Sequence, residues 1–291
     1  MHIPKTYRQR CVLGICIIFM GMILFSMPHK KIIDQIGDVS KMGDFNYLMT
    51  LMDPNRNLFY LLLPSLGGML AMYFVVTKIH KLPWVNFSTS RSFIDKKRIL
   101  FSFCLWGGVS MGLILATFLM TPEDLEWNFN APKFAVLFVI AIVMIPIQTS
   151  LEEFIFRGYL MQGLGVASKT NWLPLVVTSV VFGLMHLANP EVGKLGFGIM
   201  FFYIGTGFLL GIMTLMDEGM ELSLGFHAAN NLMTALMVTT DWTAFQTYAV
   251  FKDISEPSFK LELLAMAVLY PLLIVVFAKK YHWKDWKGKL I

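Results

Sequence analysis

Three formal charges interrupt a long apolar run in the sequence Leu151-Glu152-Glu153-Phe154-Ile155-Phe156-Arg157. On insertion-based scales each such charge near the centre of a membrane helix costs about 2.5–3.5 kcal/mol, so charged residues there usually face the protein interior and mark a functional site. Glu153 and Arg157 share one helix face, whereas Glu152 points about 100° away from Glu153. A structural ion pair needs only Glu153 and Arg157. The pattern therefore singles out Glu152 as a residue available for chemistry.

The composition is that of a polytopic membrane protein. Of the 291 residues, 56% are hydrophobic and 15% are charged, and the mean hydropathy is +0.62. A soluble domain normally has charged residues near a quarter of the total. The net charge of +5 does not imply a nucleic-acid partner, because Lys and Arg that flank membrane helices produce the same excess. We expect the lipid bilayer as its surroundings and no nucleic acid as a partner.

The cysteines carry no functional signal. Cys11, Cys16 and Cys104 lie inside apolar runs without metal-ligand spacing, and their odd number argues against a disulfide framework. We expect all three to be buried as small hydrophobic residues.

The apolar runs predict an all-α fold, a polytopic membrane bundle of about eight transmembrane helices. We divide the chain into N-terminal helices 1–3 (1–132), a core of helices 4–7 (133–240), and a last helix with a basic tail (241–291). In the sixth run, Gly207-x-x-x-Gly211 is typical of a close helix-packing face. The expected spans are 11–27, 58–77, 99–120, 134–164, 173–187, 197–215, 222–238 and 261–278.

Basic residues orient the predicted bundle. Eight spans place both tails and the segment 78–98 on one side, and the positive-inside rule makes that side cytoplasmic. We expect an integral protein of the plasma (inner) membrane with both termini in the cytoplasm. The loop with Asp217, Glu218 and Glu221 is an exception, because it lies on the same side and has no basic residue. The basic residues on that side are Lys5, Arg8, Arg10, Lys78, Lys81, Arg91, Lys96, Lys97, Arg98, Lys169, Lys279, Lys280, Lys284, Lys287 and Lys289.

Polar residues inside the later spans converge with Glu152. His186 and His227 are the two histidines within predicted spans, and the i, i+4 spacing puts Asn231 on the face of His227. At ~1.5 Å per residue, antiparallel helices bring Glu152, His186 and Asn231 to one level. We expect these side chains to line one wet cavity that opens to the cytoplasmic half of the membrane. The plainer interpretation of either histidine is a hydrogen bond between helices.

Three motifs in this order resemble those of the CPBP family of intramembrane proteases, which includes the CAAX prenyl endopeptidase and the bacterial Abi proteins linked to bacteriocin processing and self-immunity. They are Glu152-Glu153-x-x-x-Arg157, Phe182-x-x-x-His186 and His227-x-x-x-Asn231. The resemblance covers about 134–240, so the predicted core 133–240 is CPBP/Abi-like. It implies that Glu152 is the catalytic glutamate, that Glu153 and Arg157 support it, and that His186 shares the water. His227 and Asn231 are then the remaining polar residues of the active site.

The same residues suit peptide hydrolysis by either of two routes. Glu152 can take a proton from a water held by His186, while His227 and Asn231 donate hydrogen bonds to the oxyanion. Alternatively, Glu152, His186 and His227 can bind zinc with an open position, although the sequence has no His-Glu-x-x-His motif. We slightly favour metal-free chemistry, because Asn231 is a poor zinc ligand and shares a face with His227.

Two other classes of protein remain as alternatives. One is a non-catalytic membrane immunity or sensor-accessory protein that binds a membrane protein partner, in which Glu152 would be dispensable. The other is an ion-coupled transporter, for which paired repeats with broken helices are expected and none is found. We predict an intramembrane endopeptidase whose substrate is a membrane-associated, lipidated or leader peptide.

Overall fold

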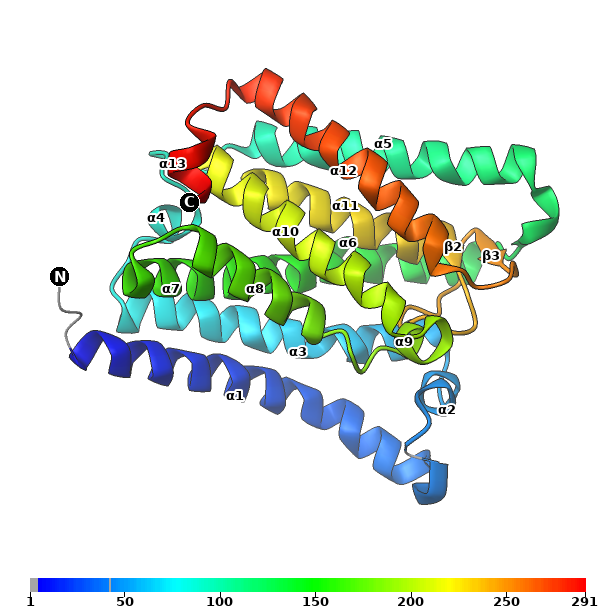
Figure 1. Cartoon of the computed structure of the whole chain (residues 1–291). Helices are drawn as coiled ribbons and strands as arrows, with labels where there is room; N and C mark the ends of the chain where they lie inside the picture. Colours follow the sequence, from blue (N-terminus) through cyan, green and yellow to red (C-terminus); the bar gives the residue numbers. More distant parts are fainter. Residues whose placement is uncertain (1–4, 42) are drawn as a thin grey trace.

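The computed structural model describes residues 5–41 and 43–291, without the side chains of residues 5–8, 45, 46 and 261. The charges of Lys5 and Arg8, on which the orientation partly rests, lie outside the described side chains. Regular structure is almost entirely helical, and the helices run back and forth between two ends of one bundle (Figure 1). The predicted all-α polytopic fold is confirmed.

The N-terminal helices form one flank of the bundle. The long helix α1 lies on the outside and packs along α3 (Figure 1). A π-helical turn extends α3 before the chain reaches the short helix α4. The elements are α1 (Lys5–Ile36), α2 (Phe45–Thr50), α3 (Pro54–Phe74), the π-helical turn Val75–Ile79, α4 (Trp84–Ser88) and α5 (Lys96–Met120).

The central helices contain the motifs. The fourth apolar run is one continuous helical rod from 131 to 168, in which a π-helical segment separates α6 from α7. α10 packs against α8, and α11 packs against both α5 and α6. The elements are α6 (Ala131–Glu153), the π-helical segment Phe154–Leu160, α7 (Met161–Ser168), α8 (Trp172–Leu184), α9 (Pro190–Leu195), α10 (Met200–Asp217) and α11 (Glu221–Met237).

A small sheet closes one end of the bundle, which the sequence did not predict. Its strand order is β1-β3-β2, with β1 antiparallel and β2 parallel to β3. Short 3₁₀ turns precede β1 and α10. The remaining elements are β1 (Leu125–Trp127), β2 (Val238–Thr239), β3 (Phe251–Asp253), α12 (Phe259–Tyr281) and α13 (Trp286–Leu290).

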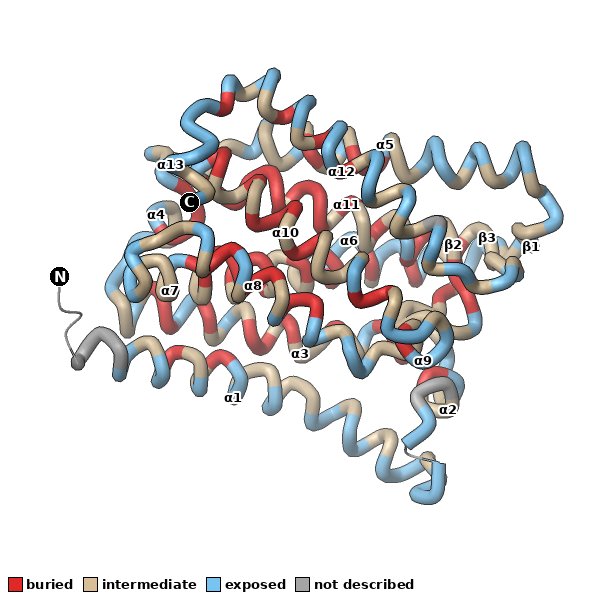
Figure 2. Tube along the Cα trace, in the orientation of Figure 1, coloured by how far each residue is buried: buried red, intermediate tan, exposed pale blue. Residues whose placement is uncertain are grey.

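The predicted count of eight spans is not confirmed. In the described part of the chain, six helices are long and apolar enough to cross a membrane. α8 has 13 residues and α11 has 17. α11 is mostly buried at the centre of the bundle (Figure 2), so it can carry polar side chains where a lipid-facing helix could not. The six helices are Gln9–Ile36, Pro54–Ile79, Lys96–Met120, Ala131–Ser168, Phe197–Asp217 and Glu262–Tyr281.

Two local predictions are wrong. The fifth span was expected to reach residue 187, but α8 ends at Leu184 and His186 lies in the turn that follows. Beyond Leu184 the backbone hydrogen bonds change from the α-helical to the 3₁₀ spacing, since the N–H of His186 donates to the carbonyl of Gly183 at 2.9 Å. The Asn189-Pro190 step then prevents the helix from continuing.

The cysteines are the second case. Cys16 and Cys104 are exposed rather than buried, because they lie on outward faces that lipid would cover.

An ion network joins the acidic loop to the basic segment that precedes α5. Asp217 accepts hydrogen bonds from Arg91 at 2.9 Å, from Arg98, and from Trp283 Nε1 at 3.1 Å. Glu221 accepts from Arg91 at 3.0 Å. The basic segment therefore neutralises the acidic loop, and both lie at the end of the bundle that holds α4 and α13 (Figure 1). The acidic loop is therefore compatible with a position on the same side of the membrane as the basic segments.

Close packing of α8 and α10 depends on a glycine of the predicted packing motif. A Cβ on Gly207 would lie 2.8 Å from the carbonyl oxygen of Ser179 and 2.9 Å from its Cα. We expect Gly207→Ala to push the two helices apart and to lower stability by about 1–3 kcal/mol, measured as a lower thermal unfolding temperature in detergent. Gly108→Ala in α5 is the control, since no atom lies within 4 Å of its Cβ position. Equal unfolding temperatures would contradict this packing argument.

Candidate active site

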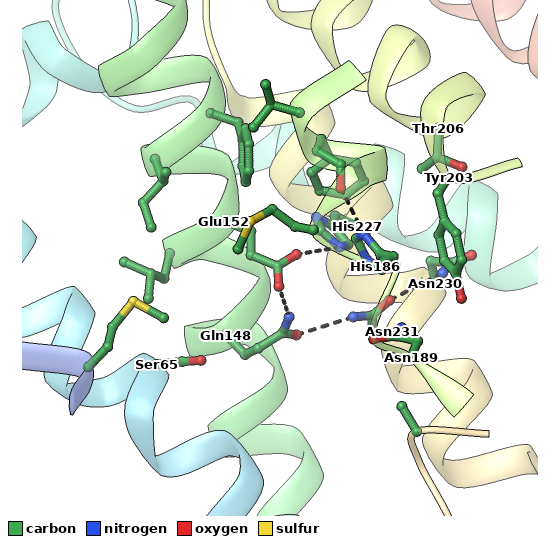
Figure 3. A pocket seen from close by; sticks show the side chains of 18 of the residues that line it. Ser65, Gln148, Glu152, His186, Asn189, Tyr203, Thr206, His227, Asn230 and Asn231 are labelled. Carbon is green, nitrogen blue, oxygen red and sulfur yellow. Dashed lines mark hydrogen bonds and ion pairs between the residues drawn. The ribbon is translucent and has the colours of Figure 1, made fainter. Parts of the chain in front are cut away.

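The motif residues meet around one cavity of about 570 Å³. Five of them line it: Glu152 from α6, Phe182 from α8, His186 from the turn after α8, and His227 and Asn231 from α11; the polar four are labelled in Figure 3. The lining extends from Tyr159, which contacts His80 of the basic segment 78–98, to Glu191 of α9 and the segment 243–245, which belong to the end opposite α4 and α13 (Figure 1). The expected opening toward the cytoplasmic half stays a prediction.

Glu153 and Arg157 lie behind the cavity and form a buried ion pair. Arg157 Nη1 donates to Glu153 Oε1 at 3.1 Å, and both side chains are 0% exposed. Arg157 Nη2 donates to the carbonyl of Gly207 at 3.0 Å, and its guanidinium lies 4.6 Å from the ring centroid of Phe182. The pair therefore connects the rod that contains α6 to α8 and α10.

His227 lies between the two glutamates. Its Nδ1 is 2.8 Å from Glu153 Oε1, and its Nε2 is 3.5 Å from Glu152 Oε2. A carboxylate only accepts hydrogen bonds, so the bond to Glu153 assigns a proton to Nδ1. This bond directs Nε2 toward Glu152 and the cavity (Figure 3). Glu153 is thus a positioning residue for the imidazole as well as the partner of Arg157.

His186 is oriented in the same way by the first residue of its own motif. Its Nδ1 is 2.8 Å from the carbonyl oxygen of Phe182, and a carbonyl can only accept, so this nitrogen also carries a proton. The ring stacks on Tyr203 with centroids 4.3 Å apart. In the neutral imidazole Nε2 is then an acceptor, available to a water or substrate in the cavity.

A directed chain of amide hydrogen bonds ends on Glu152. Trp106 Nε1 donates to Asn230, Asn230 donates to Asn231, and Asn231 donates to Gln148, at 3.1, 3.2 and 3.2 Å. Gln148 Nε2 then donates to Glu152 Oε1 (Figure 3). Because an indole N–H only donates, the chain has one direction and fixes how each amide is turned.

Sequence reasoning missed Gln148 and Asn230. Gln148 stands one turn before Glu152 on the same helix, so the i, i+4 rule applied to Glu152 would have found it. Asn230 precedes Asn231 and points to a different face, which only the position of Trp106 on α5 explains. The side chain of Glu152 remains 29% exposed despite these contacts, whereas that of Glu153 has no exposure. The two adjacent carboxylates thus lie in different surroundings.

The zinc alternative requires Glu152, His186 and His227 to approach one ion. In the part of the chain that the structure describes, no group of three or more His, Cys, Asp and Glu side chains is placed to hold a metal. Each imidazole uses Nδ1 within the protein, and His227 directs Nε2 to Glu152. The same Nδ1 bonds are typical of zinc-bound histidines, which keep Nε2 for the metal, so the metal-free and the zinc route both stay predictions.

The fold and the site define a membrane-embedded helical protein with a glutamate and two histidines around a buried cavity. Residues 131–233 match the family model described as type II CAAX prenyl endopeptidase Rce1-like. The chain thus carries an Rce1-like domain, and the resemblance to the CPBP family is confirmed.

The chain is also similar to a protein of a bacterium. The chain is 32% identical over 192 residues to the "Uncharacterized protein YyaK" of Bacillus subtilis (strain 168). The match covers 65% of this chain and 64% of YyaK, less than two thirds of that relative. No solved structure matches the chain.

The buried ion pair yields a stability prediction. Arg157→Ala leaves the Glu153 carboxylate buried without its main partner, a loss that typically costs about 3–5 kcal/mol. We expect a large fall in folded yield and in unfolding temperature in detergent. Lys252→Ala is the control, because its ion pair with Asp241 at 2.8 Å is partly exposed and should contribute at most about 1 kcal/mol. An Arg157→Ala protein as stable as this control would show that the pair has no structural role.

Proposed function

We propose that this protein is an intramembrane endopeptidase that hydrolyses a peptide bond in a membrane-associated peptide, such as a lipidated or leader peptide. The single observation that carries the proposal is the placement of Glu152. Its carboxylate is partly exposed in a cavity otherwise enclosed by helices, and Gln148 and His227 hold it from two sides. The Rce1-like domain supports the same class of reaction.

In the proposed first step Glu152 and His186 activate a water. The water lies between the Glu152 carboxylate and His186 Nε2, donating a hydrogen bond to each. Glu152 takes one proton as the general base, and the hydroxide oxygen attacks the carbonyl carbon of the scissile bond. The π bond of that carbonyl opens, and its electron pair moves to the oxygen. No metal takes part in this route.

In the second step the tetrahedral intermediate collapses. His227, in its imidazolium form, donates Nε2–H toward the oxyanion while Nδ1–H stays bonded to Glu153, and Asn231 supplies an amide N–H. The C–N bond then breaks and the carbonyl re-forms. The leaving nitrogen receives the proton that Glu152 took from the water, which returns Glu152 to its ionised form. Glu153 and Arg157 hold His227 and the helices in place throughout.

We also propose how the protein sits in the membrane. The basic segments and both ends of the described chain lie at the end of the bundle with α4 and α13 (Figure 1), which the positive-inside rule places in the cytoplasm of the plasma (inner) membrane. The cavity residues of α9 and 243–245 then face the outer half of the membrane. A peptide would reach Glu152 from that half or laterally past Ile15 and Ile18 of α1, which also line the cavity.

Replacement of the proposed base tests the function directly. We expect Glu152→Gln to abolish cleavage of a membrane-peptide library by the purified protein and to leave its unfolding temperature nearly unchanged, because the amide keeps the shape of the side chain. Glu123→Gln, at an exposed position, is the matched control and should cleave as the unmodified protein does. Retained cleavage by Glu152→Gln would end the assignment of Glu152 as the catalytic base, whereas no cleavage by the unmodified protein would support a non-catalytic, partner-binding protein.

Metal content separates the two chemical routes. In the metal-free route, active purified protein contains far less than one zinc per chain by elemental analysis, and phenanthroline does not slow cleavage. Asn231→Ala should lower kcat by about 10²–10³, the usual loss of one oxyanion donor. Zinc near one per chain that disappears together with activity in His186→Ala would establish the metal route instead.

A further inference from the structure

The cavity is acidic although the protein is basic. Its lining includes two carboxylates, Glu152 and Glu191, besides the two motif histidines and two tyrosines, and no Lys or Arg is among the described residues that line it. The chain as a whole has a net charge of +5. Arg157 does not offset the cavity carboxylates, because it is paired with Glu153 behind the wall. His227, the imidazolium of the proposed chemistry, faces Glu152 and Glu153, so that charge is already paired and the Glu191 carboxylate favours a ligand group of positive charge.

Glu191 has no role in the proposed chemistry, and half of its carboxylate is unsatisfied. It is the second residue of α9, and Oε1 accepts the N–H of Ala244 at 2.9 Å. Oε2 is shielded from solvent and has no hydrogen-bond partner among the described residues. Burial raises the pKa of the Glu191 carboxyl, against the opposing effect of the Ala244 N–H. An oxygen in such surroundings is costly unless a donor reaches it.

A ligand held in the cavity can bring a donor to this oxygen, because Glu191 is one of the residues that line the cavity. Glu191 lines the cavity together with Asn189, Thr243 and Ala244. It lies close enough to Tyr203, whose ring stacks on His186, for the two side chains to interact electrostatically. The last torsion of a glutamate side chain is soft, so a small rotation turns the unsatisfied oxygen toward a ligand. Lys and Arg side chains are long and flexible enough to extend along an apolar wall and present their donors at its end.

We propose that Glu191 forms a subsite that binds a cationic side chain, Lys or Arg, of the peptide held at Glu152. The subsite rests on the proposed function, because it assigns the ligand of the same cavity. The ammonium or guanidinium group donates a charge-assisted hydrogen bond to Glu191 while Ala244 keeps the carboxylate in place. Glu191 does not touch the scissile bond, so it determines which peptide binds and in which register.

Binding to an inactive protein tests the subsite apart from catalysis. The Glu152→Gln protein in nanodiscs is titrated with fluorescein-labelled, leucine-rich peptides of about 20 residues, long enough to span the bilayer. Each peptide has one lysine at a different position, and a matched series has Nε-acetyl-lysine, which lacks the charge. At one or two adjacent positions lysine should bind roughly 10- to 100-fold more tightly than acetyl-lysine.

Variants of Glu191 test whether its carboxylate causes the preference for lysine over acetyl-lysine. In the same background, Glu191→Gln should remove the difference between the two series, and Glu191→Asp should retain part of it. Glu262→Gln is the matched control, because Glu262 also has a buried, unpartnered oxygen but does not line the cavity. This variant should keep the full preference.

The possible outcomes separate the subsite from the proposed function. Equal binding of lysine and acetyl-lysine at every position, or a preference that survives Glu191→Gln, overturns the subsite. Failure of the unmodified protein to cleave a peptide that its Glu152→Gln form binds would overturn the protease assignment alone. If Glu191→Gln does not fold, a reduced preference in Glu191→Asp supports the subsite, because the shorter side chain moves the charge away from the ligand, and an undiminished preference there overturns it.

Discussion

The structure depends on one buried ion pair, that between Glu153 and Arg157. A guanidinium and a carboxylate with no solvent exposure are costly unless each satisfies the other and further hydrogen bonds complete them. Here those bonds come from three separate parts of the chain. Arg157 reaches Gly207 on α10 and the ring of Phe182 on α8, and Glu153 holds His227 on α11. The requirement to satisfy one pair of charges thus brings together the helices that form the cavity.

The same constraint separates two chemically identical neighbours. Glu153 is committed on the protein side of the helix, where its hydrogen bonds orient an imidazole. Glu152, one residue earlier, points into the cavity, where a chain of amides from Trp106 through Gln148 supports one oxygen and His227 faces the other. A carboxylate that is positioned yet partly exposed is suited to accept a proton from water. A buried carboxylate that binds Arg157 and His227 through Oε1 is suited to fix geometry. Adjacent positions on a helix provide both because they face different directions.

Part of the site followed directly from the sequence. Helix periodicity places Glu153 with Arg157 and His227 with Asn231, and the energetic cost of charge in an apolar run marks Glu152 without any tertiary information. The matching depth of Glu152 and His186 needed only the rise per residue of antiparallel helices. These inferences need only the geometry of one helix, or the common rise per residue of two antiparallel helices.

The tertiary structure alone decided everything that depends on contacts between distant segments. The sequence determined the class of fold, the order of the apolar helices and the residues of the three motifs. It did not determine that His186 lies in a turn after Leu184, that Asn230 links Trp106 to Asn231, or that the cavity reaches Glu191 and Ala244 at the end opposite the basic segments. The physical reason is that hydropathy and periodicity report the surroundings of one helix at a time. The direction of a hydrogen bond, the end of a short helix inside the bundle, and the opening of a cavity depend on neighbours that are distant in sequence.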